Sequence, residues 1–271
     1  MPKSETIRSL ERGLQVLSAL QSIPIASLHD VHLATGISKP SLLRILNTLV
    51  DAGLVSRRLA DGHYRISVLA RTGRKRDRYD RVSEAAAPVL DRLCQKISWP
   101  SDLFVPAGDY MERRETSRSH TPFPIRSKNV GVRANWLLSG VGRAYLAFCP
   151  NSERERILQR LRKSEKPEDQ LARDPKRLER ILAETRARGY ATRDASFVGG
   201  QYGAPPFDDG LTAIVVPLLD RVHVHASINI LFVRTAFTVE QFARLHLADL
   251  QAAAEEIVRT LETRSNVRRS R

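Results

Sequence analysis

A short segment near the amino terminus carries side chains suited to nucleic-acid contact. Ser41, Arg44 and Thr48 recur at helical spacing, so they share one face of a predicted helix whose other face is apolar. A helix of this kind fits the major groove, where Lys and Arg reach phosphate or guanine and Ser and Asn form shorter hydrogen bonds. The alternative is an ordinary solvated face. The candidate DNA-contacting residues are Ser38, Lys39, Pro40, Ser41, Arg44 and Asn47.

The preceding elements must position this segment. Apolar spacing over residues 7–20 predicts an amphipathic helix, and a second, shorter helix is predicted over 27–34. Gly36 permits a sharp turn, after which Ser38 is a candidate N-cap and Pro40 falls in the first turn of the third helix. This order of helix, turn and helix predicts a helix-turn-helix.

A β-hairpin is predicted directly after the third helix. Two strand-like runs, 55–59 and 63–68, flank the turn Ala60-Asp61-Gly62, and Asp-Gly is a strong hairpin signal. Three helices followed by such a hairpin indicate a winged helix-turn-helix. The wing arginines would lie near the flanking DNA backbone or minor groove, with solvated surface charge as the alternative. These candidates are Arg57, Arg58 and Arg65.

The charge of the chain agrees with a polyanionic partner. The formal net charge is +14 over 271 residues, and residues 54–81 hold nine Lys and Arg against three Asp. A basic protein attracts polyanions and gains affinity by releasing their counterions. No apolar run is long enough to span a membrane, and the first residues do not form a signal peptide, so we expect a cytoplasmic protein with no membrane partner.

Neither a metal, a cofactor nor a catalytic residue is predicted. Cys94 and Cys149 belong to no Cys/His cluster. His223 and His225 share one face of a predicted strand, but no third metal ligand lies nearby in the sequence. Asp208-Asp209-Gly210 indicates a turn rather than paired catalytic acids. Nucleophile-elbow, zinc-protease, Walker and dinucleotide-binding motifs are absent, so we do not expect an enzyme.

The remaining sequence interleaves strands and helices, which predicts an α+β fold. Strands are expected over 102–106, 110–116, 212–218 and 222–232, and helices over 82–97, 140–148, 175–188 and from 238 to about 261. Ser152 and Glu155 have the spacing of a capping box for a further helix. We expect a winged helix-turn-helix domain over 1–69, a linker over 70–81, a second domain over 82–263 and a basic tail over 264–271.

A family resemblance runs through the same segments. The stretch RSLERGLQVLSAL…LATGISKPSLLRILNTLVDAGLVSRRLADGHYRIS resembles the amino-terminal domain of IclR-type bacterial transcription regulators. The resemblance continues through LLSGVGRAYLAFCP, LERILAETRARGYATRD and TAIVVPLL, and covers almost the whole chain. It implies an effector domain in which helices flank an antiparallel sheet with a ligand pocket on one side. WPSDLFVPAGDYMERRETS and LSGVGRAYLAFCP look most similar to the activators of hydroxyphenylpropionate (aromatic acid) catabolism.

The resemblance also implies which residues line the effector pocket. Backbone N–H groups before the 140–148 helix would bind a carboxylate, and Asn229 falls where a polar ligand-facing residue is usual. Arg126 or Arg193, turned inward, would pair with a carboxylate in bidentate fashion, while aromatic residues supply apolar walls. The alternative is that the arginines are solvated and the aromatics belong to the core. The candidates are Phe123, Arg126, Trp136, Gly140, Val141, Arg193 and Asn229.

These features predict a sequence-specific DNA-binding transcription regulator controlled by a small-molecule effector, an aromatic carboxylic acid of a catabolic pathway. We expect a homodimer or homotetramer on a pseudo-palindromic double-stranded operator, because two half-sites supply affinity that one lacks. An activator would also contact RNA polymerase. Two other classes stay open: an enzyme acting on a small acid in the second domain, and an architectural DNA-binding protein without sequence specificity.

Overall fold

The structure, a computed structural model, describes residues 7–67, 79–125, 129–197 and 199–269, with side chains described as far as residue 263. The chain divides into two units, Met1–Glu84 (unit 1) and Ala85–Arg271 (unit 2). Most of the expected linker over 70–81, and the side chains of the expected tail over 264–271, lie outside the described residues.

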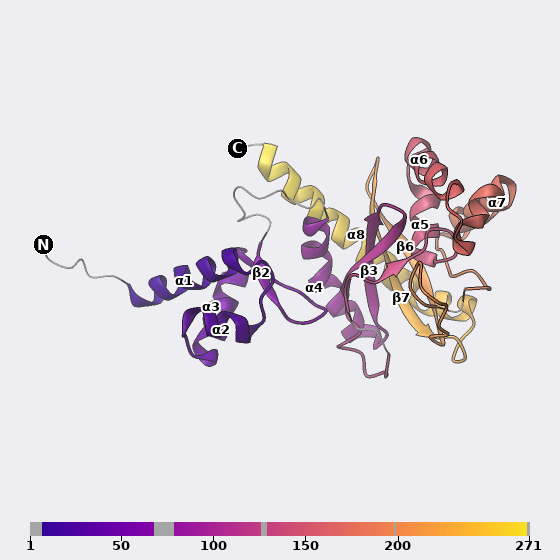
Figure 1. The fold of residues 1–271 in the computed structure, drawn as a ribbon. Helices are drawn as coiled ribbons and strands as arrows, with labels where there is room; N and C mark the ends of the chain where they lie inside the picture. The colour runs from indigo at the N-terminus through magenta and orange to yellow at the C-terminus, as the bar shows by residue number, and fades with distance from the viewer. Residues whose placement is uncertain (1–6, 68–78, 126–128, 198, 270–271) are drawn as a thin grey trace, which may run out of the picture. The chain divides into compact units, whose positions relative to one another are not determined.

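Unit 1 consists of three helices followed by a short hairpin (Figure 1). Its elements are α1 (Arg8–Ser22), α2 (Leu28–Thr35), α3 (Lys39–Asp51), β1 (Val55–Arg57) and β2 (Tyr64–Ile66). The two strands are antiparallel, with Ser56 opposite Arg65. Ser27 and Asp30 form a capping box at the start of α2, and Gly36 ends that helix with a φ of 67°, which glycine adopts without strain. The predicted winged helix-turn-helix is confirmed.

The core of unit 1 joins the apolar faces of its helices. The most buried residues, at most 1 % exposed, are Val16, Leu20, Ala26, Val31, Leu42 and Leu46. The apolar stripe predicted for the first helix is buried only in its second half, because Ile7, Leu10 and Leu14 are 67, 59 and 57 % exposed. The amino-terminal half of α1 therefore presents an apolar face that no described residue of unit 1 covers.

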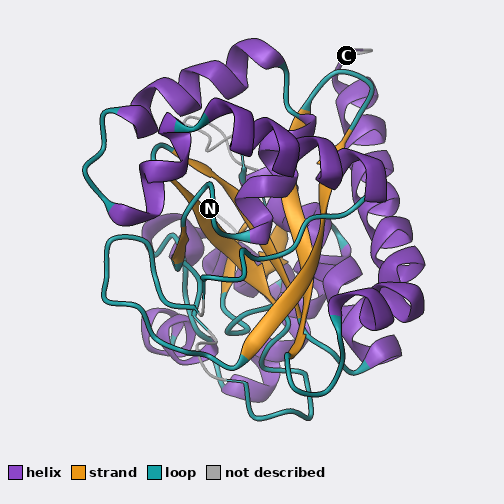
Figure 2. Cartoon of the chain, turned by 90° about the vertical axis from the view of Figure 1, so that its right-hand side faces the viewer, coloured by secondary structure: helices purple, strands orange, loops and turns teal. Residues whose placement is uncertain are grey.

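Unit 2 is built on a five-stranded antiparallel sheet with the order β5-β4-β3-β7-β6. The strands are β3 (Ser101–Ala107), β4 (Tyr110–Thr116), β5 (Arg133–Ala134), β6 (Leu211–Leu219) and β7 (Val224–Val233). The helices are α4 (Asp80–Ile97), α5 (Gly140–Phe148), α6 (Asn151–Arg162), α7 (Pro175–Arg188) and α8 (Val239–Arg269), with a 3-10 helix η1 (Pro167–Arg173). Figure 2 shows the strands with helices around them. The α+β class is confirmed.

The two faces of this sheet have different neighbours, because side chains alternate between faces along a strand. On one face, Phe232 of β7 stacks on Phe242 of α8 with ring centroids 3.8 Å apart. Ion pairs join α8 to α4. On the other face, α5 packs on β6 and β7, and Ser227 donates a hydrogen bond of 3.0 Å from Oγ to the carbonyl of Val141. This second face is the one that positions the site described below.

Two predictions about helix ends are wrong. Helix α6 has Pro150 at its N-cap and no capping box, and Glu155 instead forms an ion pair of 2.6 Å with Arg162. Helix α8 continues to Arg269, since neither Gly nor Pro interrupts the stretch after residue 261. Within the described residues, no helix combines the length and apolarity needed to cross a bilayer.

Candidate functional site

One face of α3 is open to solvent and carries most of the residues predicted to contact DNA. The exposed residues are Ser38, Lys39, Pro40, Arg44 and Asn47. Ser41 is half-buried. Ser38 occupies the N-cap position without capping the helix through its side chain, and its hydroxyl donates to Ser41 Oγ at 3.1 Å. A single rigid helix thus presents a cation, a guanidinium and a carboxamide to solvent.

An apolar side chain on the same face escapes prediction from the sequence. Leu43 is 41 % exposed. It lies four residues after Lys39 and four before Asn47, so it shares their stripe. Its neighbours Leu42 and Leu46 are fully buried. Leu43 is exposed because it lies on a different face of the same helix. This stripe therefore combines polar groups with one apolar group.

Two of the three predicted wing contacts lie at or near the surface. Arg57 is exposed, and its Nε donates to the carbonyl of Gly62 at 3.3 Å. Arg58 has a side chain that is only 13 % exposed and forms an ion pair of 2.7 Å with Asp61. Because Asp61 offsets the charge of Arg58, Arg57 is the better placed of the two to meet a phosphate.

The prediction that Arg65 contacts DNA is corrected, because Arg65 is buried. Its Nε donates to Ser56 Oγ at 3.1 Å, and its Nη1 lies 3.4 Å from Asp80 Oδ1. Glu84 accepts hydrogen bonds of 3.1 Å from Ser56 and Ser67 beside it. All three residues of β2 are buried, so alternation along the strand does not bring Arg65 to the surface. Arg65 ties the hairpin to the start of α4 and does not face DNA.

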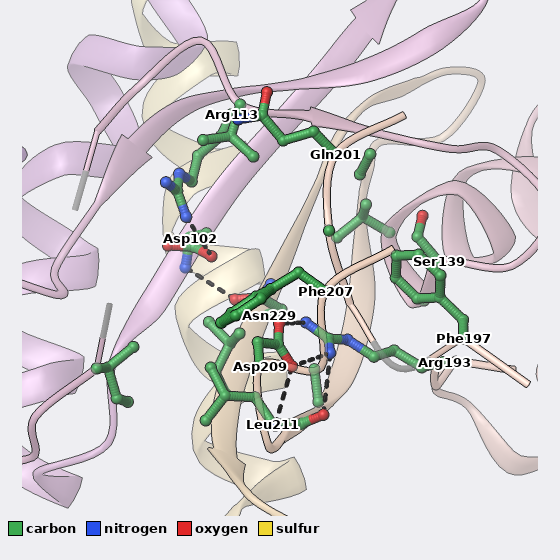
Figure 3. A pocket seen from close by; sticks show the side chains of 18 of the residues that line it. Asp102, Arg113, Ser139, Arg193, Phe197, Gln201, Phe207, Asp209, Leu211 and Asn229 are labelled. Atoms are coloured by element: carbon green, nitrogen blue, oxygen red, sulfur yellow. Dashed lines mark hydrogen bonds and ion pairs between the residues drawn. The ribbon is translucent and has the colours of Figure 1, made fainter. Parts of the chain in front are cut away.

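Unit 2 contains a cavity of about 900 Å³, within the size range of small-molecule sites (Figure 3). Alternate residues of β6 and β7 line it, which shows that it lies against the α5 face of the sheet. The strand residues are Leu211, Ala213 and Val215 of β6 and Asn229, Leu231 and Val233 of β7. Aromatic residues supply much of the remaining wall, namely Phe104, Phe123, Phe197 and Phe207.

The amino end of α5 forms part of the cavity wall. Ser139 accepts a hydrogen bond of 3.2 Å from the N–H of Gly142 and donates to the carbonyl of Asn135. Gly140 and Val141, two of the candidate effector-binding residues, line the cavity, and their amides have no hydrogen-bond acceptor among the described residues. Such a helix end offers N–H groups and partial positive charge to an anion or a polar oxygen.

Glycine is required twice at this helix end because the backbone approaches its neighbours closely. A Cβ on Gly142 would lie 2.2 Å from the carbonyl oxygen of Trp136, and one on Gly140 would lie 2.7 Å from Val215 Cγ2. Both distances are far below van der Waals contact. Any larger residue would displace α5 from the chain before it or from the sheet.

Asn229, another candidate effector-binding residue, is 3 % exposed and lines the cavity. Its Oδ1 accepts a hydrogen bond of 2.8 Å from the backbone N–H of Asp102, which fixes the orientation of the carboxamide (Figure 3). Its Nδ2 has no acceptor among the described residues. Asn229 therefore holds two N–H donors ready for a ligand.

Arg193 also lines the cavity, but its guanidinium is already paired. Nη1 and Nη2 donate to the two carboxylate oxygens of Asp209 at 2.7 and 2.9 Å, and Nη1 donates to the carbonyl of Leu211 at 2.9 Å (Figure 3). This corrects the expectation that Arg193 is available to clamp a ligand carboxylate. The second candidate clamp, Arg126, lies outside the described residues.

The two predicted apolar wall residues differ. Phe123 lines the cavity and stacks on Trp99, with ring centroids 4.2 Å apart. Trp136 is fully buried outside the lining, and its indole N–H donates to the carbonyl of Gly108 at 3.1 Å. The prediction for Trp136 is corrected, because its ring belongs to the core.

A buried charged cluster at the cavity wall was not predicted from the sequence. Asp102, Arg113 and Arg118 all line the cavity. Arg118 donates from Nε and Nη2 to the two oxygens of Asp102 at 3.1 and 2.7 Å, and Arg113 Nη1 lies 3.7 Å from Asp102 Oδ2. Burial alone would raise the pKa of Asp102, but Arg118 and Arg113 lower it to about 2. The register of β3 and β4 and the turn after β4 bring the three together, so no sequence motif marks them.

The chain matches two family models. Residues 9–59 match the IclR helix-turn-helix domain, and residues 78–259 match the bacterial transcriptional regulator IclR C-terminal domain. The second match alone covers more than half of the chain. The chain belongs to the IclR family.

Relatives and solved structures agree with this membership. "Probable transcriptional regulator SauR" of Cupriavidus necator is 28 % identical over 260 residues, which cover 92 % of this chain and 94 % of that protein. The HTH-type transcriptional regulator BhcR of Paracoccus denitrificans is 28 % identical over 211 residues, covering 74 % of this chain and 73 % of that one. Thermotoga maritima IclR has the same fold, with a TM-score of 0.52 at 21 % identity, covering 94 % of this chain and 99 % of that one.

Membership of the IclR family makes the chain a DNA-binding transcriptional regulator whose carboxy-terminal domain binds a small-molecule effector. The family consists of regulators, which removes the enzyme alternative. The cavity of unit 2 lies in the effector domain, and the exposed stripe of α3 lies in the DNA-binding domain.

Proposed function

We propose that this IclR-family regulator responds to an aromatic carboxylic acid of a catabolic pathway, bound in the cavity of unit 2. The observation that carries the proposal is the make-up of the cavity wall. More than half of its lining residues are apolar, four of them phenylalanines, and most of the others carry charged or polar side chains. Such a wall suits a ligand with an aromatic body and a charged end.

Two polar features support an oxygen-rich ligand. The amides of Gly140 and Val141 point from the amino end of α5, and the carboxamide of Asn229 is held by its bond to Asp102. All of these groups are donors, and a carboxylate is a pure acceptor. A neutral apolar ligand would leave the donors unsatisfied, which costs binding free energy.

A thermal-shift experiment tests the effector class. We expect benzoate or 3-phenylpropionate to raise the melting temperature of the full chain in a concentration-dependent way, because a ligand of the folded state stabilises it by mass action. Acetate lacks the ring and benzamide lacks the charge, so both should give a smaller shift. Absence of any shift with the aromatic acids would overturn the effector class and leave the DNA-binding assignment standing.

The DNA-binding part of the proposal is that α3 reads a specific operator. Lys39, Arg44 and Asn47 are exposed on one stripe, and Arg57 of the hairpin is exposed as well. We further propose a homodimer, or a homotetramer of two dimers, on a pseudo-palindromic operator. The exposed apolar face formed by Ile7, Leu10 and Leu14 of α1 supports this, since exposed apolar faces mark protein contacts. An activator would in addition contact RNA polymerase.

The operator test uses a duplex selected from random sequences. Lys39→Ala and Arg44→Ala should each weaken binding by about tenfold or more, the usual value of one direct contact. Arg177→Ala removes the same charge from an exposed position in unit 2 and should change affinity by less than about twofold. Wild-type affinity in both α3 variants would refute the contact assignment. Equal wild-type affinity for selected and random DNA at physiological salt would favour an architectural DNA-binding protein.

A further inference from the structure

One loop, residues 199–210, forms the side of the cavity opposite the sheet, and we call it the flap. It contains neither helix nor strand. Gly203 and Pro206 are exposed and do not line the cavity. Their neighbours in the flap line it, namely Gln201, Ala204, Pro205 and Phe207. Residues that line the cavity and residues that face only solvent thus follow one another in a single layer of chain.

The base of the flap is fixed beside β6. The two ends of the loop are in contact, since a Cβ on Gly199 would lie 2.6 Å from the carbonyl oxygen of Phe207. Such a closed surface loop is an Ω-loop. Asp209 is held by Arg193 in a bidentate ion pair, and it accepts a hydrogen bond of 3.0 Å from the amide of Leu211, the first residue of β6. The base therefore stays with this edge of the sheet.

The tip of the flap reaches the opposite edge of the sheet. Tyr202 donates from its backbone amide to the carbonyl of Arg133 in β5 at 2.9 Å. Strands β5 and β6 are the two edges of the five-stranded sheet, about 19 Å apart at the usual strand spacing. The flap thus crosses the sheet, and the cavity lies between the flap and the strands (Figure 3).

The side chain of Tyr202 fastens the tip. Tyr202 is 8 % exposed, and its hydroxyl donates to Oδ2 of the buried Asp169 in η1 at 2.6 Å. Nζ of Lys166 lies 4.1 Å from the centre of the tyrosine ring, a cation–π contact. Tyr202 does not line the cavity, so it can act on a ligand only through the flap.

The other attachments of the tip are weak. Residues 203–208 are exposed. Among the described residues, only Tyr202 of the flap donates its backbone amide to a backbone carbonyl outside the flap. Asp208 pairs with Arg234, but both side chains are exposed, and exposed pairs contribute little. A segment with so few buried contacts opens at a low cost in free energy, and Tyr202 supplies most of that cost.

The backbone of the flap is suited to turn at its ends. Gly199 and Gly210 have φ values of 132° and 66°, a region open to glycine. Pro205 and Pro206 between them have a fixed φ, which stiffens the middle. Motion about the two ends is typical of a hinged segment.

We infer that the flap is a hinged cover of the effector cavity and that Tyr202 is the latch that keeps it shut. The inference rests on the proposed function, because it takes the cavity as the effector site. The effector enters and leaves when Tyr202 separates from Asp169 and the tip lifts from β5. Free and bound protein open by the same step, so the latch sets how fast the effector exchanges rather than how tightly it binds.

The variant Tyr202→Phe removes only the hydroxyl of the latch. Fluorine NMR line shapes of 3-(4-fluorophenyl)propionate with the full chain give the dissociation rate, calorimetry gives the dissociation constant, and the association rate follows from both. We expect both rates to rise by about tenfold to a hundredfold, the usual value of a hydrogen bond to a charged group. The dissociation constant should hardly change.

Tyr145→Phe is the matched control. The Tyr145 hydroxyl donates to Glu153 at 2.7 Å, so this variant also loses a tyrosine–carboxylate bond, but one outside the flap and outside the cavity lining. Both rates should keep their wild-type values. Near-UV circular dichroism of the ligand-free variants establishes folding. If Tyr202→Phe does not fold, Lys166→Met weakens the latch by removing the cation from the ring, and both rates should again rise together.

Amide hydrogen exchange of the ligand-free chain gives a readout that needs no effector. Tyr202→Phe should speed exchange in peptides over 199–210 and leave peptides over α5 unchanged, because only the flap opens more often. Tyr145→Phe should not speed exchange in the flap.

The outcomes separate the inference from the proposed function. A folded Tyr202→Phe variant that exchanges the acid at the wild-type rates overturns the inference, while the proposed function stands. Faster dissociation with unchanged association also overturns it, because that pattern indicates a lost contact in the bound state. If wild type binds no aromatic acid, the proposed function fails, and hydrogen exchange still decides whether Tyr202 holds the flap.

Discussion

Arg193 and Asp209 form a bidentate ion pair in the cavity wall, with Nη1–Oδ1 and Nη2–Oδ2 distances of 2.7 and 2.9 Å. Their side chains are 14 and 22 % exposed. A second ion pair, formed by the adjacent residue Asp208 with Arg234, is far more open, with side chains 51 and 42 % exposed. The two pairs differ mainly in how much water reaches them.

We expect this difference to appear in double-mutant cycles. Alanine substitutions of Arg193 and Asp209 should be non-additive by about 1 kcal/mol or more, because removing one partner leaves the other charged and half-buried. The Arg234–Asp208 cycle should give less than about 0.5 kcal/mol, as is usual for solvent-exposed pairs. Urea unfolding of the single and double variants measures both, and equal coupling energies would contradict the burial argument.

Substitution of Arg65 should affect folding, and substitution of Arg44 should affect DNA binding. Arg65→Met leaves Asp80 and Glu84 buried beside a lost cation, so we expect a loss of about 2 to 4 kcal/mol in the unfolding free energy of unit 1. Arg44→Ala removes an exposed charge and should leave stability within about 0.5 kcal/mol.

The salt dependence of operator binding is the second readout for this pair. Arg44→Ala should lower the slope of log affinity against log salt by about 1 if Arg44 contacts a phosphate. The folded fraction of Arg65→Met should keep the wild-type slope. A reduced slope in Arg65→Met would show that Arg65 reaches DNA after all.

Leu43 makes a separate prediction about base recognition. An exposed leucine on a helix in the major groove can contact the methyl group of thymine. Replacing each thymine of a selected operator by deoxyuridine removes only that methyl group. We expect at least one such replacement to weaken wild-type binding and to have no further effect on Leu43→Ser. Additive effects at every thymine would contradict the contact.

The secondary structure was largely predictable, because local signals and tertiary packing agree in most elements. The capping box at Ser27 and the left-handed Gly36 delimit α2 at the residues that the sequence indicates. Asp174 as the N-cap, Pro175 in the first turn and Gly189 as the C-cap delimit α7 in the same way. Prediction failed at β5 and η1, which are too short for a periodic pattern, and at the end of α8, where no breaker residue stops the helix.

The site was predictable only where a single segment forms it. The α3 stripe and the Gly140–Val141 loop follow from local sequence, and the structure exposes both, the first to solvent and the second to the cavity. The grouping of Asp102 with Arg113 and Arg118 depends on the register between β3 and β4 and on the turn after β4, and neither strand alone specifies that register. The predictions for Arg65 and Trp136 were wrong for a related reason, because elements distant in the sequence bury both side chains.

Acid should weaken the protein through Asp102. Its pKa is held at about 2 in the folded protein, against 3.8 for an ordinary aspartate. Because the folded value is the lower one, the stabilisation is fully present above pH 4 and is lost as the pH falls towards 2. We expect Asp102 to contribute about 2 kcal/mol to this loss.

Urea unfolding between pH 5 and pH 2.5 measures the contribution of Asp102. Asp102→Asn should start less stable, because the arginines lose their counter-ion, and should then lose less stability than wild type over this range. Parallel curves for the two proteins would show that other carboxylates account for the acid sensitivity.

The tight fit of Gly140 and Gly142 against Val215 and the Trp136 backbone has a consequence for how related sequences are compared. The Ser-Gly-Val-Gly sequence is required for the close packing of one helix, α5. This requirement is the same whatever molecule enters the cavity. Strand residues that line the cavity, such as Leu231 and Asn229, can differ between relatives while that sequence stays intact. Two proteins that share this sequence therefore share a fold. Whether their effectors are chemically similar has to be judged from the strand residues that line the cavity.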